Sequence, residues 1–273
     1  MPRAAVGEPM CRLGASLWYA GAPAAREAVR DNLRHVLGRE PRPGEVREVF
    51  FNGALNYWDV LLIPSLSKPR LFELVRLHGK EHIDAARAAG RGVILAGAHL
   101  SSVSLVGQMV PALGYPTLSI LEPIQPPRLY DFFTRRREAL GGRMLPATSF
   151  VVREMLAALK RNEVVGVVSD RDLRGTGVLV RFFDAPARFP DGLAALALRS
   201  GAPMLPSVAV RRADGTFEAI IEPPLPVPST GNPKQDALAL TQALAGRLEY
   251  HIAKHPEQWT VFQRRWSEGF ARE

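Results

Sequence analysis

The sequence predicts an α/β protein with a mainly parallel central sheet, helices on both faces of that sheet and a helical segment in front of it. From residue 66 onward, short apolar runs typical of buried strands alternate with segments of helical periodicity. The residues before that point show helical periodicity only. We therefore expect one domain over residues 1–273, with a helical part at 1–65 and an α/β core at 66–273.

The helical part is expected to contain at least two helices. Residues 23–37 place apolar side chains at helical spacing, and Gly38 is a typical C-terminal stop. Pro43 can open the next helix, which carries one apolar stripe. Residues 10–25 form either an interfacial helix that lies among lipid headgroups or a helix packed on its neighbour. The residues alone leave both interpretations open.

The α/β core is expected to alternate strands and helices along the chain. Strands are expected at 71–77, 92–97, 116–121, 164–169, 203–210 and 216–222. Helices are expected at 81–90, 101–114, 127–142, 149–162, 191–201 and 233–254. Ligands of such sheets bind beyond the carboxyl ends of the strands, so we look there for the functional residues.

Composition and charge limit the function classes. The chain has 47% hydrophobic residues and one cysteine, Cys11, which excludes an internal disulfide framework and a cysteine-based metal cluster. No apolar run is long enough for a membrane-spanning helix. The net charge of +8 favours anionic partners such as a lipid surface, nucleic acid or a phosphorylated carrier. The excess of arginine over lysine is also typical of a GC-rich genome, so the charge alone does not establish an anionic partner.

A histidine, His99, follows the strand expected at 92–97. A neutral imidazole can take a proton from an alcohol, and a carboxylate on its other nitrogen fixes its tautomer. If Ser101 caps the helix that follows, the N–H groups of the first turn form a site for an oxyanion or a phosphate. A core histidine bonded to the backbone is the alternative.

Other patterns carry less weight. His251 and His255 have a spacing that suits zinc on a helix, but no third ligand is evident, and we expect no metal and no redox cofactor. No G-x-S-x-G sequence occurs, so a serine hydrolase lacks its usual nucleophile setting. Residues 257–266 alternate aromatic and basic side chains. Without a nucleic-acid motif, we favour an extension held on the core by Trp259 and Phe262, and no nucleic-acid partner.

Four blocks of sequence, in order, resemble the bacterial lipid A biosynthesis acyltransferase family, which includes the phosphatidylinositol mannoside acyltransferases. The blocks are GKEHIDAARAAGRGVILAGAHLSS at 79–102, FFTRRREALGGRMLP at 132–146, the stretch 159–206, and HPEQWTVFQRRW at 255–266. The resemblance spans roughly residues 20–268. Within the third block, SDRDL followed by FF leans toward the mannoside branch.

The resemblance implies transfer of a fatty acyl chain from acyl-CoA or an acyl carrier protein to a hydroxyl of a membrane glycolipid. It also implies a peripheral protein on the cytoplasmic face of the inner membrane, with contact to an anionic membrane surface and without a cofactor. The family's mark is a histidine followed, after four residues, by Asp or Glu. Mapped here, the histidine is His99 and the acid position is Ser104, where the sequence departs from the family.

The loss of the acid leaves two interpretations. Either the protein is a weakened or inactive relative that binds lipid or the acyl donor, or another carboxylate partners His99. Asp170 is our first choice and Asp172 the second, because both follow a strand whose carboxyl end lies on the same edge of the sheet. A turn or an ion pair with an arginine is the alternative role for Asp170.

Arginine suits phosphate because its planar fork binds in bidentate fashion. The resemblance indicates that Arg137, of the three arginines at 135–137, points at the donor's phosphates or at the floor of the site, and Arg171 is a second candidate. Ser101, Ser104 and Asp172 complete the expected substrate contacts. Two other functions remain as alternatives, a thioesterase or lipase and a nucleic-acid binder. Release of free fatty acid without an acceptor would favour the thioesterase or lipase. Salt-dependent retention on DNA would favour the nucleic-acid binder.

Overall fold

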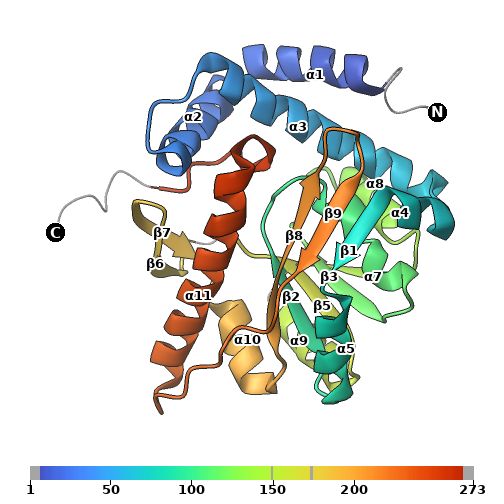
Figure 1. Ribbon diagram of the computed structural model, residues 1–273, viewed down its shortest axis with the longest axis vertical. Helices are drawn as coiled ribbons and strands as arrows, with labels where there is room; N and C mark the ends of the chain where they lie inside the picture. Colours follow the sequence, from blue (N-terminus) through green and yellow to red (C-terminus); the bar gives the residue numbers. More distant parts are fainter. Residues whose placement is uncertain (1–6, 149, 173–174, 267–273) are drawn as a thin grey trace.

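The computed structural model describes residues 7–148, 150–172 and 175–266. In this part of the chain, the main sheet has seven strands in the order β1-β9-β8-β2-β5-β3-β4. The strands are β1 Val75–His78, β2 Val93–Gly97, β3 Thr117–Leu121, β4 Arg143–Pro146, β5 Val164–Val168, β8 Met204–Arg211 and β9 Phe217–Ile221. Strands β8, β2, β5, β3 and β4 are parallel, and β9 joins the edge of β8 antiparallel. The predicted α/β class with a mainly parallel sheet is confirmed (Figure 1).

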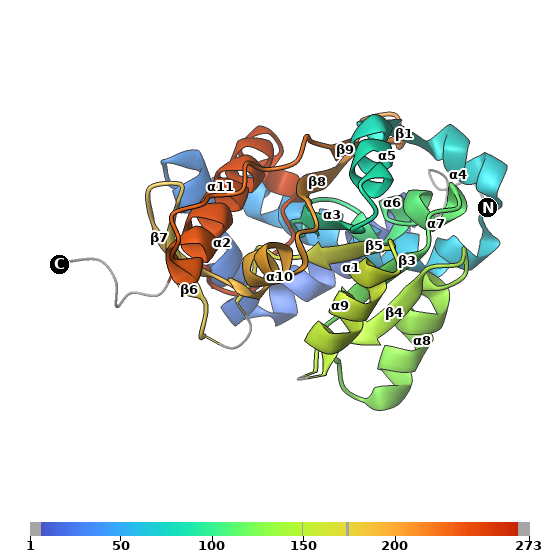
Figure 2. The same cartoon turned by 90° about the horizontal axis from the view of Figure 1, so that it is seen from below.

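Helices cover both faces of the sheet. The helices of the described residues are α1 Glu8–Gly21, α2 Pro23–Leu37, α3 Pro43–Leu62, α4 Lys68–Leu74, α5 Lys80–Ala88, α6 Val103–Val106, α7 Met109–Ala112, α8 Pro127–Arg137, α9 Val151–Lys160, α10 Gly192–Ser200 and α11 Pro233–Lys254. Helices α9, α10 and α11 pack on one face through a single large apolar cluster. Helices α5 and α7 pack on the other face (Figure 2).

The N-terminal helices α1, α2 and α3 form as predicted and share an apolar cluster of their own. Gly38 ends α2 in the left-handed conformation, with φ +63°, which a side chain would disfavour. Helix α3 then crosses the edge of the sheet near the carboxyl ends of its central strands, so that its residues reach the site described below (Figure 1). None of the helices in the described ranges has the length and apolar character needed to cross a bilayer.

The elements predicted at 71–77 and 101–114 differ in the structure. Residues 71–77 are not one strand: Ser67 caps α4 by accepting from the N–H of Arg70, and only Val75–His78 is extended. The helix expected at 101–114 is broken into α6 and α7 at Gly107, where an added Cβ would lie 2.8 Å from the carbonyl oxygen of Val103. Ser149, the expected start of α9, lies outside the described residues.

Residues 178–189 form a hairpin that the sequence did not predict. Strands β6 Val178–Phe182 and β7 Ala185–Phe189 pair antiparallel in a small second sheet. Its turn is Phe183–Asp184, with Phe183 at φ +56°, in place of the glycine that usually signals such a turn. Pro186 within β7 further disguises the strand, since proline is depleted in sheets.

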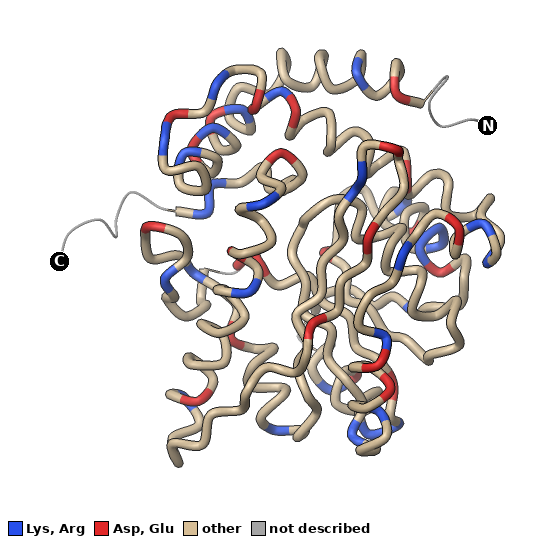
Figure 3. The backbone as a smooth tube through the Cα atoms, in the orientation of Figure 1, with Lys and Arg blue, Asp and Glu red and all other residues tan. Residues whose placement is uncertain are grey.

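Charged residues gather on the outer helices and turns (Figure 3). The central strands β2, β3 and β5 contain none, as expected for strands covered on both faces. Charged and polar groups at the carboxyl ends of these strands therefore stand out as candidates for function.

Candidate active site

His99 stands two residues beyond the carboxyl end of β2, and its side chain is 30% exposed. Its carbonyl oxygen accepts from the backbone N–H of Thr260 at 2.9 Å and from the hydroxyl of the same residue at 3.2 Å. The loop that carries the histidine is thereby fixed by a segment more than 150 residues further along the chain.

Asp170 stands two residues beyond the carboxyl end of β5, which pairs with β2 so that Val168 lies beside Gly97. The shared register places Asp170 next to His99: the Nδ1 of His99 lies 2.6 Å from Oδ1 of Asp170. The other oxygen, Oδ2, accepts the backbone N–H of His99 at 2.9 Å and the indole N–H of Trp259 at 2.8 Å. Asp170 is fully buried.

Burial opposes the ionisation of Asp170, but the electrostatic attraction to His99 and the hydrogen bonds from His99 and Trp259 outweigh it and lower its pKa to about 2. An ionised carboxylate accepts only, so the Nδ1 of His99 carries the proton that is donated to it. The Nε2 of His99 then keeps its lone pair and can act as a base.

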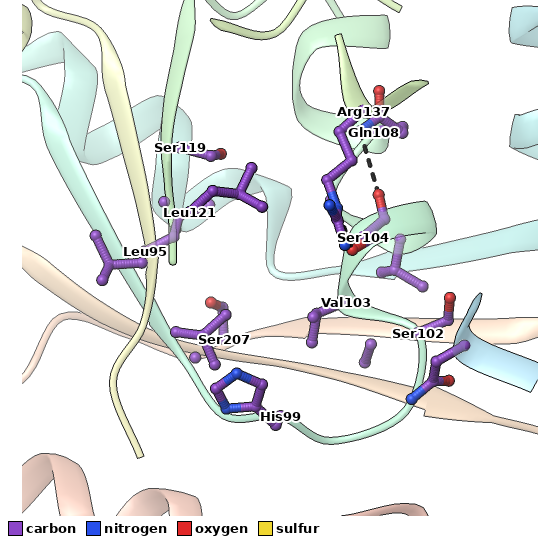
Figure 4. A pocket seen from close by; sticks show the side chains of 18 of the residues that line it. Leu95, His99, Ser102, Val103, Ser104, Gln108, Ser119, Leu121, Arg137 and Ser207 are labelled. Atoms are coloured by element: carbon purple, nitrogen blue, oxygen red, sulfur yellow. Dashed lines mark hydrogen bonds between the residues drawn. The ribbon is translucent and has the colours of Figure 1, made fainter. Parts of the chain in front are cut away.

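A cavity of about 650 Å³ extends from His99 along the sheet. Its size lies within the range of about 300–1,000 Å³ typical of small-molecule sites. Apolar side chains from the sheet and from α6 and α7 form much of its wall, among them Leu95, Val106, Met109, Val110 and Ile221. Helix α3 contributes Gly53, Asn56, Tyr57 and Val60. In Figure 4, His99 and the pair formed by Ser104 and Arg137 stand at different parts of this wall.

Ser104, which the sequence resemblance maps onto the family's acid position, bonds to an arginine and not to the histidine. The Nε–H of Arg137 donates to the Ser104 hydroxyl at 2.9 Å (Figure 4). Burial lowers the pKa of Arg137, and no carboxylate pairs with it within the described residues. Arg135 is exposed, and Arg136 lies over the ring of Phe132, so only one of the three arginines directs its charge into this wall.

The expected cap by Ser101 is wrong. Ser102 is the residue that precedes α6, and neither serine caps it with its side chain. Ser101 adopts φ +55°, its N–H donates to the carbonyl of Gln258 at 2.8 Å, and its own carbonyl accepts the N–H of Val103. The first N–H of α6 is thus occupied. The hydroxyls of Ser101 and Ser102 are buried in the cavity wall and have no partner within the described residues.

Arg171 and Asp172 have different surroundings. Arg171 lines the cavity and pairs with Glu122, also in the lining, at 3.0 Å. Asp172 is not among the lining residues; it accepts the N–H groups of Gly175 and Gly177 at 3.1 and 2.7 Å. The structure therefore places Asp170, and not Asp172, against His99.

His251 and His255 have different surroundings from those that a zinc site would need. His251 bonds to Glu222 at 2.7 Å, and no group of three or more His, Cys, Asp or Glu side chains in the described ranges has a geometry that could hold an ion. The sequence also missed part of the site. Asn56 and Tyr57 of α3, and Ser207 of β8, line the cavity, and their positions depend on long-range packing that no local motif signals.

Comparison with known proteins shows what this chain is similar to. Phosphatidylinositol mannoside acyltransferase of Mycobacterium tuberculosis is 34% identical over 250 residues, which cover 88% of this chain and 77% of the relative. The protein of the same name in Mycolicibacterium smegmatis is 31% identical over 93% of this chain and 83% of its own length. Lipid A biosynthesis acyltransferase of Haemophilus influenzae is 27% identical over 71% of this chain and 59% of its own length.

The protein is thus an O-acyltransferase of lipid metabolism. It belongs to the family described as bacterial lipid A biosynthesis acyltransferase, whose model matches residues 1–268. The resemblance found in the four sequence blocks is confirmed.

Proposed function

We propose that the protein transfers a fatty acyl chain from a thioester, acyl-CoA or an acyl carrier protein, to a hydroxyl of a membrane glycolipid, with His99 as general base. The pairing of the Nδ1 of His99 with the buried Asp170 at 2.6 Å is the observation that carries this proposal. It leaves the Nε2 lone pair for the proton of an incoming alcohol. The names of the relatives at 31–34% identity favour a sugar hydroxyl on a phospholipid as the acceptor.

The proposed reaction has two steps. The acceptor oxygen attacks the thioester carbonyl carbon while its proton moves to the Nε2 of His99, and the carbonyl oxygen becomes an oxyanion. The C–S bond then breaks, and the leaving thiolate takes the proton back from the imidazolium. Asp170 stabilises that imidazolium, the role that the lost acid at Ser104 cannot fill. Arg137 is our candidate for stabilising the oxyanion or the donor's phosphates.

The rest of the cavity wall suits the proposed substrates. Apolar side chains between the sheet and α7 offer a place for an acyl chain. The buried hydroxyls of Ser101 and Ser102, and Arg171 with its partner Glu122, offer polar contacts to an acceptor. These substrate contacts of Ser101, Ser104, Arg137 and Arg171 are part of the proposal.

We further propose that the protein works as a peripheral protein at the cytoplasmic face of the inner membrane, docked on an anionic surface through α1. Leu13 and Leu17 of this helix are 65% and 66% exposed, and Met10 extends the same outward apolar stripe. An amphipathic helix of this kind inserts its apolar side chains among headgroups. The overall charge of +8 favours an anionic surface.

The test is an acyl-transfer assay with long-chain acyl-CoA or acylated carrier protein and vesicles that contain phosphatidylinositol mannoside, read by mass spectrometry. We expect acylated glycolipid from the wild-type protein and none from His99→Ala. An inactive, lipid-binding relative would give no product with any donor. A thioesterase would release free fatty acid at the same rate with and without the acceptor.

A further inference from the structure

The C-terminal strap, defined here as residues 258–263, runs against the loop that carries His99. The carbonyl of Gln258 accepts the N–H of Ser101, the N–H of Thr260 donates to the carbonyl of His99, and Trp259 forms a bridge with Leu100 between them. The strap is therefore hydrogen-bonded to the histidine loop through the residues before and after Trp259. This brings the Trp259 indole to the buried side of the His99–Asp170 pair.

Trp259 completes the set of donors around the Asp170 carboxylate. Oδ1 of Asp170 faces the ring of His99, while Oδ2 accepts the indole N–H at 2.8 Å together with the backbone N–H of His99 at 2.9 Å. One oxygen is thus held by backbone and indole, and the other is directed at the imidazole. A carboxylate that rotated would lose at least one of these charge-assisted bonds.

The indole itself has little freedom to move. Trp259 is 2% exposed and packs edge-on against Phe182 and Trp266, with ring centroids 5.9 and 6.3 Å away. Trp259 is not among the residues that line the cavity, so its indole contacts Asp170 and not a substrate bound there.

The strap is anchored from two other parts of the fold. The side-chain amide of Gln258 exchanges two hydrogen bonds with the backbone of Arg211 in β8, at 2.8 and 3.0 Å. The amide of Asn32 in α2 donates to the carbonyls of Val261 and Gln263, at 3.1 and 2.9 Å. The position of the indole is therefore set by the sheet and by the N-terminal helices together.

We propose that Trp259 is a positioning residue of the acyl-transfer reaction: its indole N–H holds the Asp170 carboxylate in the orientation that keeps the His99 proton on Nδ1. This proposal rests on the proposed role of His99 as the base. Arg265 also interacts electrostatically with Asp170 and with Asp172. The guanidinium of Arg265 donates to the carbonyl of Arg188, whereas the side-chain donor to Oδ2 of Asp170 is Trp259.

The experiment replaces Trp259 by β-(3-benzothienyl)alanine, which has sulfur in place of the indole N–H and keeps the size of the ring. Trp259→Phe is a second variant. Trp266→Phe is the matched control, because Trp266 packs on the same Phe182 and its indole N–H has no partner within the described residues. We measure kcat, KM for the acyl donor and the pH dependence of kcat for each variant, with His99→Ala as reference.

We expect the benzothienyl variant to lose about tenfold to a hundredfold in kcat, the equivalent of one hydrogen bond to a charged group, with KM nearly unchanged. The pKa of Asp170 rises in this variant, because the carboxylate has lost a donor that favours its charged form, so the part of the acidic limb that follows protonation of Asp170 moves to higher pH. Trp266→Phe should keep both the kcat and the pH profile of the wild type.

A benzothienyl variant with wild-type kcat and pH profile overturns the positioning role, even if Trp259→Phe is unstable, because only the N–H was removed. An equal loss in Trp266→Phe would also overturn it, since packing would then explain the effect. A fully active His99→Ala would instead refute the proposed function itself, so the two failures are distinguishable.

Discussion

Arg137 reaches from α8 to α6 and donates its Nε–H to the hydroxyl of Ser104, 2.9 Å away, the residue that the sequence resemblance maps onto the family's acid position. The contact is between a cation and a neutral group, so the charge of Arg137 is not cancelled within the described residues. The serine thus leaves a positive charge in the cavity wall, and the pairing of His99 with Asp170 does not involve it.

Restoring the acid should not improve the enzyme. In Ser104→Glu, the new carboxylate would pair with Arg137 and neutralise it, and His99 already has Asp170 as its partner. We expect kcat to stay within about threefold of the wild type or to fall, and KM for the acyl donor to rise, in steady-state assays. A gain of about tenfold or more in kcat would show instead that the wild-type site is weakened by its serine.

Removing the charge of Arg137 should weaken the reaction strongly. Arg137→Met keeps the length of the side chain and loses the cation, so kcat/KM for a phosphate-bearing donor should fall by about tenfold to a hundredfold. Arg135→Met, at an exposed position on the same helix, is the matched control and should have little effect. Equal losses in the two variants would point to general surface charge and not to a specific contact.

The stability of the protein should depend on the ionisation of Asp170. Its pKa is lowered in the folded state to about 2, so the stabilisation is complete above its ordinary value of 3.8 and is lost as the pH falls toward 2. A shift of this size corresponds to about 2 kcal/mol of unfolding free energy. Urea unfolding of the wild type and Asp170→Asn from pH 7 to pH 2 measures it. The difference in unfolding free energy between the two proteins should shrink as the pH falls from about 4 to 2. A difference that stays constant would contradict the lowered pKa of Asp170.

The exposed leucines of α1 should control binding to vesicles. Leu13→Ser combined with Leu17→Ser removes two apolar groups that face outward, so flotation with anionic liposomes should fall severalfold while the protein stays folded. Val227→Ser, at an equally exposed site on a loop, should leave flotation unchanged. Undiminished flotation of the double variant would exclude α1 as the docking helix.

The parts of the fold with a strong periodic pattern could be predicted from the sequence, and those set by distant contacts could not. The run 233–254 has the bounds of α11 because Asn232 caps it and its apolar positions recur at helical spacing. The hairpin β6–β7 was missed because its turn has no glycine and its second strand contains Pro186. Residues 71–74 have the composition of a strand, but the cap at Ser67 makes them helical.

For the candidate site, strand order was the deciding information. The placement of His99 and Asp170 at the ends of two strands follows from the sequence, but their contact needs β2 and β5 to be neighbours in register. The contact between Ser104 and Arg137 depends on how α8 packs beside α6, and the sequence contained no signal for it. The same holds for the indole of Trp259, which the sequence placed in the core without a partner.

The acyl-transfer rate of Asp170→Asn tests the proposed reaction most directly. Asparagine keeps the size of the side chain and can still accept from Trp259, but its amide N–H group favours the tautomer of His99 with the proton on Nε2, which cannot act as a base. We predict a fall in kcat of about 10⁴, as in proteases that lose the equivalent acid, with donor binding retained. Turnover within about tenfold of the wild type would contradict the role assigned to the His99–Asp170 pair.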